Sequence, residues 1–300
     1  MPRAIHDHSQ WGMGDQLGAG NYLTPEKRLE ALALVRHGQL FDLSHVIEFG
    51  APRYEPVQTP YLLLGAPNWQ GAVRRRRQAG ATNDAGSNLE RIEMTTHVGT
   101  HIDALGHFTV GSEMYGGNDA NEISTDFGLL KLGIEHAPSI VSRGLLVDVS
   151  GLDGGKFLEA GRCVGPNDIE TILANNKTTI RQGDIVLINT GWGRFYMNDN
   201  ARYLDGEPGI NLAAARWLTK QGVTAIGTDT MAVEVLPGED APTVQMPVHQ
   251  HCLVDAGVYL IENLLLTPLT DAAITEFCFI LLPVKFKGAT GSPARPIAMV

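Results

Sequence analysis

One short stretch of the chain concentrates side chains that bind metal ions or move protons. His97, His101, Asp103 and His107 lie within eleven residues and include three of the ten histidines. Neutral imidazoles and a carboxylate are the donors that a divalent ion of borderline hardness accepts. His97, His101 and Asp103 are therefore predicted to hold a metal ion. Spacing alone leaves open which of the four residues is a ligand and which is an acid or base.

The spacing of these residues is incompatible with one straight helix. The rings of His97 and His101 would share a helix face, but Asp103 would point about 200° away from His101, at roughly 100° per residue. Gly99 supplies the conformational freedom for a turn, so the segment is predicted to bend there. Asp103 is expected to begin a short helix that carries His107 close to the metal.

A second group of ligand-type residues lies in the other half of the chain. His249, Gln250 and His251 are consecutive, and Glu262 follows them. These side chains are predicted to complete the coordination of the metal or to hydrogen-bond its ligands. Without the first group, the same residues would fit equally well a turn that carries two exposed histidines.

Short apolar runs alternate with amphipathic segments around both groups. Runs bounded by Gly, Asp or Asn are typical of strands buried on both faces. Thr24 as N-cap, Pro25 at the first helical position and Gly38 as a stop predict an early helix. The alternation predicts an α/β or mixed α+β sheet and argues against a helical bundle or an all-β sandwich. The expected strands are 145–149, 185–190, 225–227, 258–261 and 277–282, and further helices are expected at 166–174 and 211–222.

The segment from Leu64 to Asn88 is polar, rich in glycine and without a core-facing periodicity. Its run Arg74–Arg77 is interpreted as a solvated helix face or loop rather than a binding site for an anionic substrate or phosphate. A lid over the active site is an alternative role for the segment. Trp69, or else Trp192, is predicted to pack on an aromatic substrate, although tryptophan is more often a core residue.

Length and composition limit the class of protein. The 300 residues with 43% hydrophobic content are predicted to form one domain, 1–300. Acidic residues outnumber basic ones by 33 to 23, which argues against a nucleic-acid partner. Because there is no run of twenty apolar residues and Met1–Gln10 is polar, we expect a cytoplasmic protein with neither a membrane span nor a secretory signal.

The pattern His-x-Gly-Thr-His-x-Asp-x-x-x-His, from His97 to His107, resembles the signature of the metal-dependent cyclase family, which includes bacterial kynurenine formamidase and isatin hydrolase. Blocks along most of the chain resemble its longer members. The resemblance implies a hydrolase with one α/β domain, in which a mixed, curved, open barrel-like sheet is flanked by helices. It also implies a homo-oligomer, a dimer or tetramer. Further matching blocks are 18–21, 23–26, 183–188, 190–192, 227–230, 247–250 and 288–296.

The resemblance also assigns roles to matching residues. His97, His101 and Asp103 would be metal ligands, and His107 would be the catalytic acid/base. One divalent ion is implied as cofactor, with Mn²⁺ preferred and Zn²⁺ possible.

The formamidase branch holds a second zinc through a distant His and a Glu twelve residues later, but Gln250 stands twelve residues before Glu262. The isatin hydrolase branch completes a mononuclear manganese site with a Gln, so Gln250 is the expected fourth ligand. His249, His251 and Glu262 would then surround the ligands or hold a second metal.

These assignments predict hydrolysis of an amide bond in a small aromatic lactam by a metal-activated water, with an aryl formamide as the alternative substrate. A non-haem iron oxygenase is less favoured, because its two-His, one-carboxylate site generally sits on an all-β fold. A non-catalytic metal-binding protein would need closed coordination and would have no use for His107.

Overall fold

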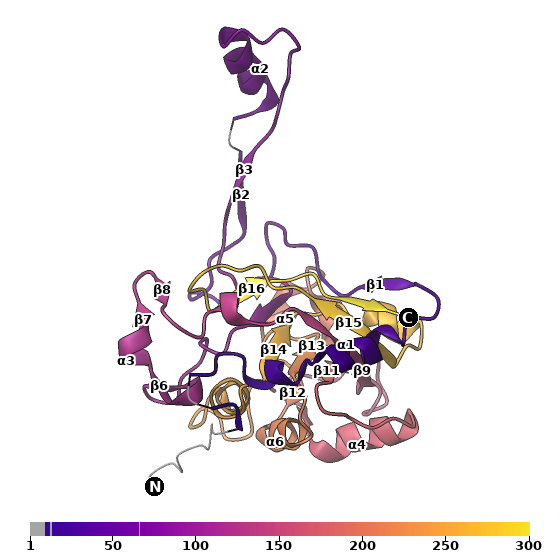
Figure 1. Cartoon of the computed structure of the whole chain (residues 1–300). Helices are drawn as coiled ribbons and strands as arrows, with labels where there is room; N and C mark the ends of the chain where they lie inside the picture. The colour runs from indigo at the N-terminus through magenta and orange to yellow at the C-terminus, as the bar shows by residue number, and fades with distance from the viewer. Residues whose placement is uncertain (1–9, 13, 66) are drawn as a thin grey trace.

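A curved nine-stranded sheet lies at the centre of the computed structural model, which describes residues 10–12, 14–65 and 67–300 (Figure 1). Four neighbouring strands in the middle of the sheet, β9, β11, β13 and β14, run parallel, and antiparallel strands extend both sides. In spatial order the strands are β1 (Leu40–Asp42), β17 (Ile297–Met299), β15 (Glu276–Leu281), β9 (Ile140–Asp148), β11 (Ile185–Asn189), β13 (Ala225–Thr228), β14 (Tyr259–Glu262), β4 (His101–Asp103) and β16 (Gly291–Pro293).

Helices flank this open, curved sheet, so the predicted fold class is confirmed (Figure 1). The five predicted strands and both later helices are present, with shifts at their ends. Helix α4 (Pro166–Asn175) packs beside α6 (Leu212–Lys220), and the π-helix η6 (Gln250–Ala256) packs on α6. Buried, near-continuous apolar runs in the central parallel strands explain why these elements could be recognised.

The first α-helix, α1 (Pro25–Leu32), begins as predicted and ends early. The hydroxyl of Thr24 accepts a hydrogen bond from the backbone N–H of Lys27 at 3.2 Å, and Pro25 is the first helical residue. The helix does not reach Gly38, because the backbone turns after Leu32. The prediction of its end was therefore wrong by about five residues.

The remaining elements are short and lie in the connections. They are α3 (Ala120–Ile123), α5 (Asn200–Tyr203), α7 (Pro247–His249), α8 (Thr267–Asp271), β5 (Glu113–Met114), β6 (Asn118–Asp119), β7 (Ser124–Thr125), β8 (Gly128–Leu129), β10 (Cys163–Val164), β12 (Gly209–Ile210) and the 3₁₀ turns Gly18–Tyr22, Tyr115–Gly117, Ile134–His136 and Trp192–Phe195. No helix among the described residues is long and apolar enough to cross a membrane. Of the polar segment Met1–Gln10, only Gln10 lies within the described residues.

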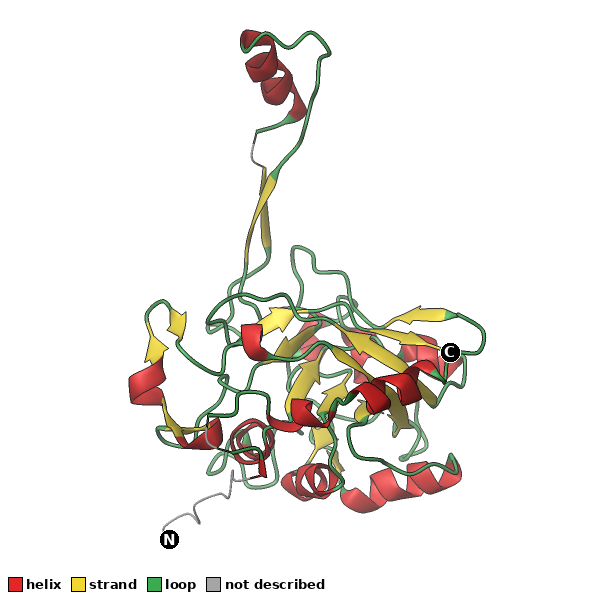
Figure 2. Cartoon of the chain, in the orientation of Figure 1, coloured by secondary structure: helices red, strands yellow, loops and turns green. Residues whose placement is uncertain are grey.

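Residues 62–65 and 67–93 form an arm that stands away from the body (Figure 2). Strands β2 (Leu62–Gly65) and β3 (Glu90–Glu93) pair as an antiparallel ribbon, and helix α2 (Trp69–Gln78) lies at the tip. The side chain of Asn68 caps this helix by accepting a hydrogen bond from the N–H of Gly71 at 2.9 Å. The four arginines therefore lie on a helix, one of the two settings expected for them, and they are good helix formers.

A buried ion-pair network ties α1 to the central sheet. The carboxylate of Asp184, which directly precedes β11, lies 2.6 Å from Lys27 Nζ and 2.6 Å from Arg143 Nη2. Arg143, on β9, also donates to Glu276 Oε1 on β15 at 2.7 Å and to the Thr179 carbonyl at 2.6 Å. Asp184 and Arg143 are almost completely buried. Lys27 and Arg143 thus share the buried carboxylate of Asp184, and each has a second, partly exposed acidic partner, Glu30 and Glu276 respectively.

We expect Asp184→Asn to lower the free energy of unfolding by about 3–5 kcal/mol, because it leaves the charge of Arg143 buried beside a neutral amide. Chemical denaturation of the two proteins measures the difference. Glu159→Gln, which breaks the exposed ion pair with Arg202, is the matched control and should change stability by less than about 1 kcal/mol. Equal effects of the two substitutions would contradict the assigned role of the network.

Candidate metal centre

The pairing register of two neighbouring strands brings three potential metal ligands together. His101 and Asp103 are the first and last residues of β4, so their side chains leave the same face of that strand. Glu262 ends the neighbouring strand β14 and is the direct register partner of His101. His101, Asp103 and Glu262 offer donor atoms that all lie within 4.8 Å of one another. All three residues are buried.

The segment before β4 bends at Gly99, as predicted. Gly99 has a φ of 71°, in the left-handed region that favours glycine. Asp103, however, ends a strand instead of beginning a helix, so the helix expected there is absent. A turn carries His107 back to the site, and its backbone N–H donates to the carbonyl of Ala104 at 3.0 Å. A helix could not start at Asp103 because β4 is held between β14 and β16 up to that residue.

His107 and His97 lie side by side at the edge of this group. Their rings stack with centroids 4.1 Å apart. Together with Asp103 they form a second set of donors within 4.8 Å of one another. The two sets share Asp103, which therefore lies at the centre of the candidate metal site.

Two of the histidines are oriented by acceptors outside the site. His101 Nδ1 lies 2.8 Å from the carbonyl oxygen of Gly99, which can only accept, so Nδ1 carries the hydrogen. His249 Nδ1 lies 2.6 Å from Glu234 Oε1 in the same kind of pair. Each ring therefore turns its Nε2 toward the carboxylates. His101 Nε2 is 3.1 Å from Glu262 Oε2, and His249 Nε2 is 3.1 Å from Glu262 Oε1.

His97 is held on its other side by the segment around β16. Its Nε2 lies 2.9 Å from the hydroxyl of Thr290, and its Nδ1 lies 2.9 Å from Asp103 Oδ1. A Cβ at Gly291 would lie only 2.7 Å from the ring, so glycine is needed at this position. Histidine ligands of metals characteristically place one nitrogen on an outer partner and leave the other for the ion.

The polar atoms at the centre of the site lack hydrogen-bond partners among the described residues. Both carboxylate oxygens of Asp103 and the Nε2 of His101 are buried and make no hydrogen bond of acceptable geometry, although ionic contacts surround them. Burial opposes ionisation of Asp103, but the neighbouring imidazoles of His107, His101 and His97 hold the pKa of its carboxyl well below its usual range. An ionised, unpartnered carboxylate among imidazole nitrogens fits a divalent cation.

In the ion-free chain, the negative charge of the buried carboxylates is balanced by protonated imidazole rings. Burial lowers the pKa of His101, but the carboxylates of Asp103 and Glu262 outweigh it and raise the pKa to about 10. His249 behaves alike, because Glu234 and Glu262 raise its pKa to about 10 against the effect of burial. His107 shows the opposite shift. Burial lowers the pKa of His107 to about 3, so its imidazole is neutral near pH 7.

Gln250, expected as the fourth ligand, points elsewhere, and its neighbour approaches the site. The amide nitrogen of Gln250 donates to the carbonyl of Thr109 at 3.1 Å. His249 Nε2, in contrast, lies 3.7 Å from Asp103 Oδ2 as well as 3.1 Å from Glu262. The histidine beside Glu262 is therefore His249, thirteen residues before it, and not a residue at the twelve-residue position that Gln250 occupies. Ligation by Gln250 itself stays a prediction.

His251 and the two tryptophans lie outside the cluster formed by the ligand-type residues. His251 Nε2 is 2.9 Å from the hydroxyl of Thr219, on α6. Trp192 is 1% exposed, packs against Phe195 and donates to the Tyr203 carbonyl, so a substrate contact would require this aromatic core to open. Trp69 begins helix α2 at the tip of the arm. A substrate contact by either tryptophan stays a prediction.

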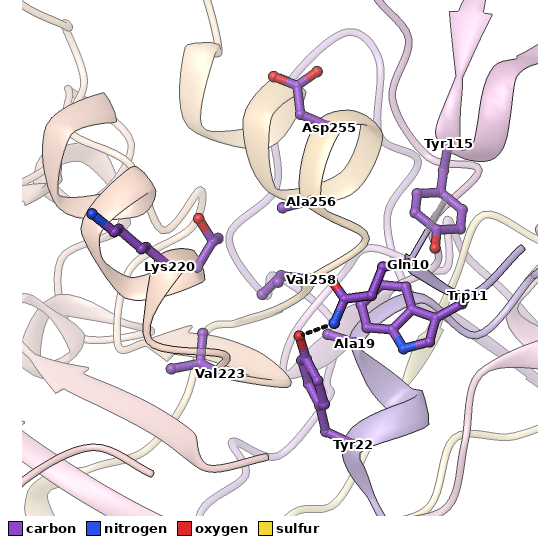
Figure 3. Close-up of a pocket in the computed structure, with 11 residues that line it drawn as sticks. Gln10, Trp11, Ala19, Tyr22, Tyr115, Lys220, Val223, Asp255, Ala256 and Val258 are labelled. Atoms are coloured by element: carbon purple, nitrogen blue, oxygen red, sulfur yellow. Dashed lines mark hydrogen bonds between the residues drawn. The ribbon is translucent and has the colours of Figure 1, made fainter. Parts of the chain in front are cut away.

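A cavity of about 220 Å³ opens between the N-terminal segment and the C-terminal ends of α6 and η6 (Figure 3). Trp11 and Tyr22 line one side, and Lys220 and Val258 line the other. The side chain of Gln10, which also lines the cavity, donates to the hydroxyl of Tyr22 at 2.7 Å (Figure 3). Of the described residues that line this cavity, none belongs to either donor set.

Two residues that support the site were not identified from the sequence. Glu234 accepts hydrogen bonds from the backbone N–H of Val248 and His249 as well as from the His249 ring, and nothing in its sequence neighbourhood signals this role. Thr290, which holds His97, lies in the matching block 288–296. That block could have directed attention to it.

An open, curved α/β sheet with a buried centre of histidines and carboxylates at one edge defines the class of this protein. The cyclase family model matches residues 41–235, and the chain belongs to that family. A solved structure described as a novel cyclase is 30% identical, covers 99% of this chain and 100% of its own, and has a TM-score of 0.86.

Two further relatives carry functional names. The kynurenine formamidase of Geobacillus thermodenitrificans is 28% identical over 76% of this chain and 89% of its own length. Isatin hydrolase A from Labrenzia aggregata is 22% identical, with a TM-score of 0.66, and covers 92% of this chain and 98% of its own. The second likeness shows the shared fold.

We expect the apparent affinity for Mn²⁺ to rise as pH rises from 6 toward 10. Because the pKa values of His101 and His249 are raised to about 10 in the ion-free chain, both rings are protonated at neutral pH, and a ring that becomes a ligand must lose its proton. Each displaced proton contributes up to about tenfold in affinity per pH unit. Competition with a metal indicator across this range measures the slope.

The half-buried His136, which belongs to neither donor set, provides the control, because its replacement by alanine should leave that slope unchanged. An affinity independent of pH, without proton release in calorimetry, would contradict the assignment of these histidines to the site.

Proposed function

We propose that this chain is a metal-dependent hydrolase that cleaves the amide bond of a small aromatic lactam. The observation that carries the proposal is the buried Asp103, whose two unpartnered carboxylate oxygens face imidazole nitrogens. Membership of a family with formamidase relatives supports hydrolysis of a carbon–nitrogen bond. In this proposal the hydrolase unit extends over residues 1–300.

His97, His101 and Asp103 are the proposed ligands of one divalent ion, preferably Mn²⁺, with Gln250 as a fourth ligand if its amide turns away from Thr109. The chemistry supplied by such an ion, when bound, is activation of water and polarisation of the substrate carbonyl. Thr290 and the Gly99 carbonyl fix the rings of His97 and His101, so little reorganisation is needed on binding. The lack of a Gly-x-Ser-x-Gly elbow in the sequence agrees with a mechanism without a serine nucleophile.

His107 is the proposed acid/base. Burial lowers its pKa to about 3, so at neutral pH the imidazole is neutral and has one unprotonated ring nitrogen, as a general base must. The nearby negative charge of Asp103 stabilises the imidazolium that forms, since this charge raises the pKa of His107 against burial. His107 then returns the proton to the amide nitrogen as the carbon–nitrogen bond breaks. Water supplies the hydroxyl group of the acid product, so the atoms balance.

An aryl formamide is the second candidate substrate, and one observation favours it. His249 and Glu262 extend the donor set beyond Asp103, with 3.1 Å between His249 Nε2 and Glu262 Oε1. Together with Asp103, His249 and Glu262 would hold a second divalent ion, which would supply further polarisation of the substrate carbonyl. The kynurenine formamidases among the relatives support the same substrate class.

The roles of two histidines can be separated by substitution. We expect His101→Ala to lose metal and turnover together, because it removes a buried ligand. His107→Ala should keep the metal and lose turnover by about 10²–10⁴-fold, the usual contribution of a general acid–base. Metal content and turnover are measured on the same samples. If the His107→Ala protein were found to be metal-free, His107 would have to be counted as a metal ligand.

The number of ions distinguishes the two candidate substrates. We expect elemental analysis to find one divalent ion per chain, and turnover of isatin-like lactams to exceed that of aryl formamides. Removal of the ion by a chelator should abolish turnover, and Mn²⁺ should restore more activity than Zn²⁺. Two zinc ions per chain together with preferential hydrolysis of aryl formamides would replace the lactam proposal by the second candidate.

A further inference from the structure

Glu207 is a buried glutamate that belongs to neither donor set and lies just before β12. It is 1% exposed, and it forms no ion pair with a lysine, arginine or histidine of the described part of the chain. Its two carboxyl oxygens instead accept hydrogen bonds from the backbone N–H groups of Met231 and Ala232, both at 2.7 Å. Burial of a carboxyl is costly unless its oxygens are satisfied, so these two N–H groups account for its place in the core.

The two N–H groups lead into a turn with an unusual backbone conformation. The N–H of Glu234 donates to the carbonyl of Ala232, which closes a three-residue turn around Val233. Val233 has a φ of 59°, in the left-handed region where a β-branched residue is an outlier. Such a conformation persists only where the surrounding structure holds it. Glu207 contributes to holding it, because its carboxyl binds both residues that precede the outlier.

The backbone near Glu207 contacts the same turn. Glu207 and Leu236 exchange backbone hydrogen bonds of 2.7 and 3.0 Å, and the N–H of Ile210 donates to the carbonyl of Val233 at 3.2 Å. A Cβ at Gly209 would lie 2.5 Å from that carbonyl oxygen, so glycine permits the close approach. The turn is therefore fixed by one neighbouring segment, through both its backbone and the side chain of Glu207.

The turn determines where the carboxylate of Glu234 lies. Glu234 Oε1 is 2.6 Å from His249 Nδ1, and its two oxygens also accept the backbone N–H groups of Val248 and His249 at 3.2 and 3.0 Å. On the other side of the ring, His249 Nε2 lies 3.1 Å from Glu262 Oε1. Gln250, the expected fourth ligand, follows directly in the chain. A displacement of Glu234 would thus release both the His249 ring and the backbone that leads to Gln250.

We propose that Glu207 is a positioning residue of the metal centre, which acts through the turn around Val233 on Glu234 and through Glu234 on His249. It contacts neither substrate nor ion in this role. The effect on metal binding rests on the proposed function, whereas the effect on His249 does not. If Glu207 only stabilised its own loop, a change at Glu207 would leave the contacts of Glu234 with Val248 and His249 intact.

Hydrogen exchange of the full chain without added metal tests the effect on His249. Glu207→Gln replaces one acceptor oxygen by an amide nitrogen that cannot accept, so one of the two N–H groups loses its partner. We expect the amides of Val248 and His249 to exchange about tenfold faster than in the parent, because the loss of one hydrogen bond in the turn loosens Glu234. The amides of residues 231–234 should respond in the same way.

Asp168→Asn is the matched control for exchange. Asp168 also accepts a backbone hydrogen bond, from the N–H of Gly165 at 3.0 Å, but it does so at the start of α4. This substitution should leave exchange at Val248 and His249 unchanged. Circular dichroism and the thermal midpoint of each variant establish that it is folded.

A double-mutant cycle on the dissociation constant for Mn²⁺ tests the route through Glu234. Glu207→Gln and Glu234→Gln should each raise this constant by about tenfold, and the double variant should resemble Glu234→Gln alone, because residues that act through one another are not additive. Two independent supports would multiply their effects. With Co²⁺ in place of Mn²⁺, the visible absorption spectrum should change in Glu207→Gln and stay that of the parent in Asp168→Asn.

Unchanged exchange at Val248 and His249 in a folded Glu207→Gln protein would overturn the proposal, as would multiplied effects in the double variant. If the parent binds no Mn²⁺, the proposed function fails, while the exchange comparison still decides the role of Glu207. If Glu207→Gln does not fold, Glu207→Asp, which withdraws both oxygens by one methylene, is measured in its place against the same expectations.

Discussion

The candidate site depends on one buried negative charge. Asp103 sits at the end of a strand with no solvent contact and no hydrogen-bond donor of proper geometry, a position that an isolated carboxylate cannot occupy at acceptable cost. Only positive charge in the same small volume makes it tolerable. The protein surrounds it with imidazoles, whose rings accept either a proton or a shared cation, so the stability of this region and its capacity for chemistry have the same origin.

The orienting contacts explain why several distant segments must meet at this point. His101 is held by its own turn, His97 by the segment before β16, and His249 by Glu234. Each contact fixes which ring nitrogen faces the carboxylates. The curved sheet supplies the meeting place, because β4 lies between β14 and β16 in an antiparallel arrangement at one side of the sheet. As a result, side chains that are more than 150 residues apart in the sequence lie within hydrogen-bond distance of each other in the folded chain.

Local patterns in the sequence predicted much of this architecture, and long-range contacts explain the failures. The central strands were recognisable because they are apolar on both faces, and the start of α1 because Thr24 and Pro25 act within one turn. The end of α1 and the conformation after Asp103 depend on packing with distant elements, which spacing does not encode. Glu234 could not be recognised at all, because a buried carboxylate acquires its role only from the ring that the fold brings to it.

The π-helix η6 begins at Gln250, immediately after His249, and continues to Ala256. A π-helix closes its hydrogen bonds over five residues instead of four, so each turn consumes more chain than an α-helical turn. This wider turn lies between His249 and Glu262, whose ring Nε2 and carboxylate Oε1 lie 3.1 Å apart. Counting back twelve positions from Glu262 selects Gln250, whereas the ring that lies beside Glu262 in the structure is that of His249. A π-helical turn holds more chain than an α-helical turn, so a helix widened in this way can take up a change of length while the donors beside it keep their places.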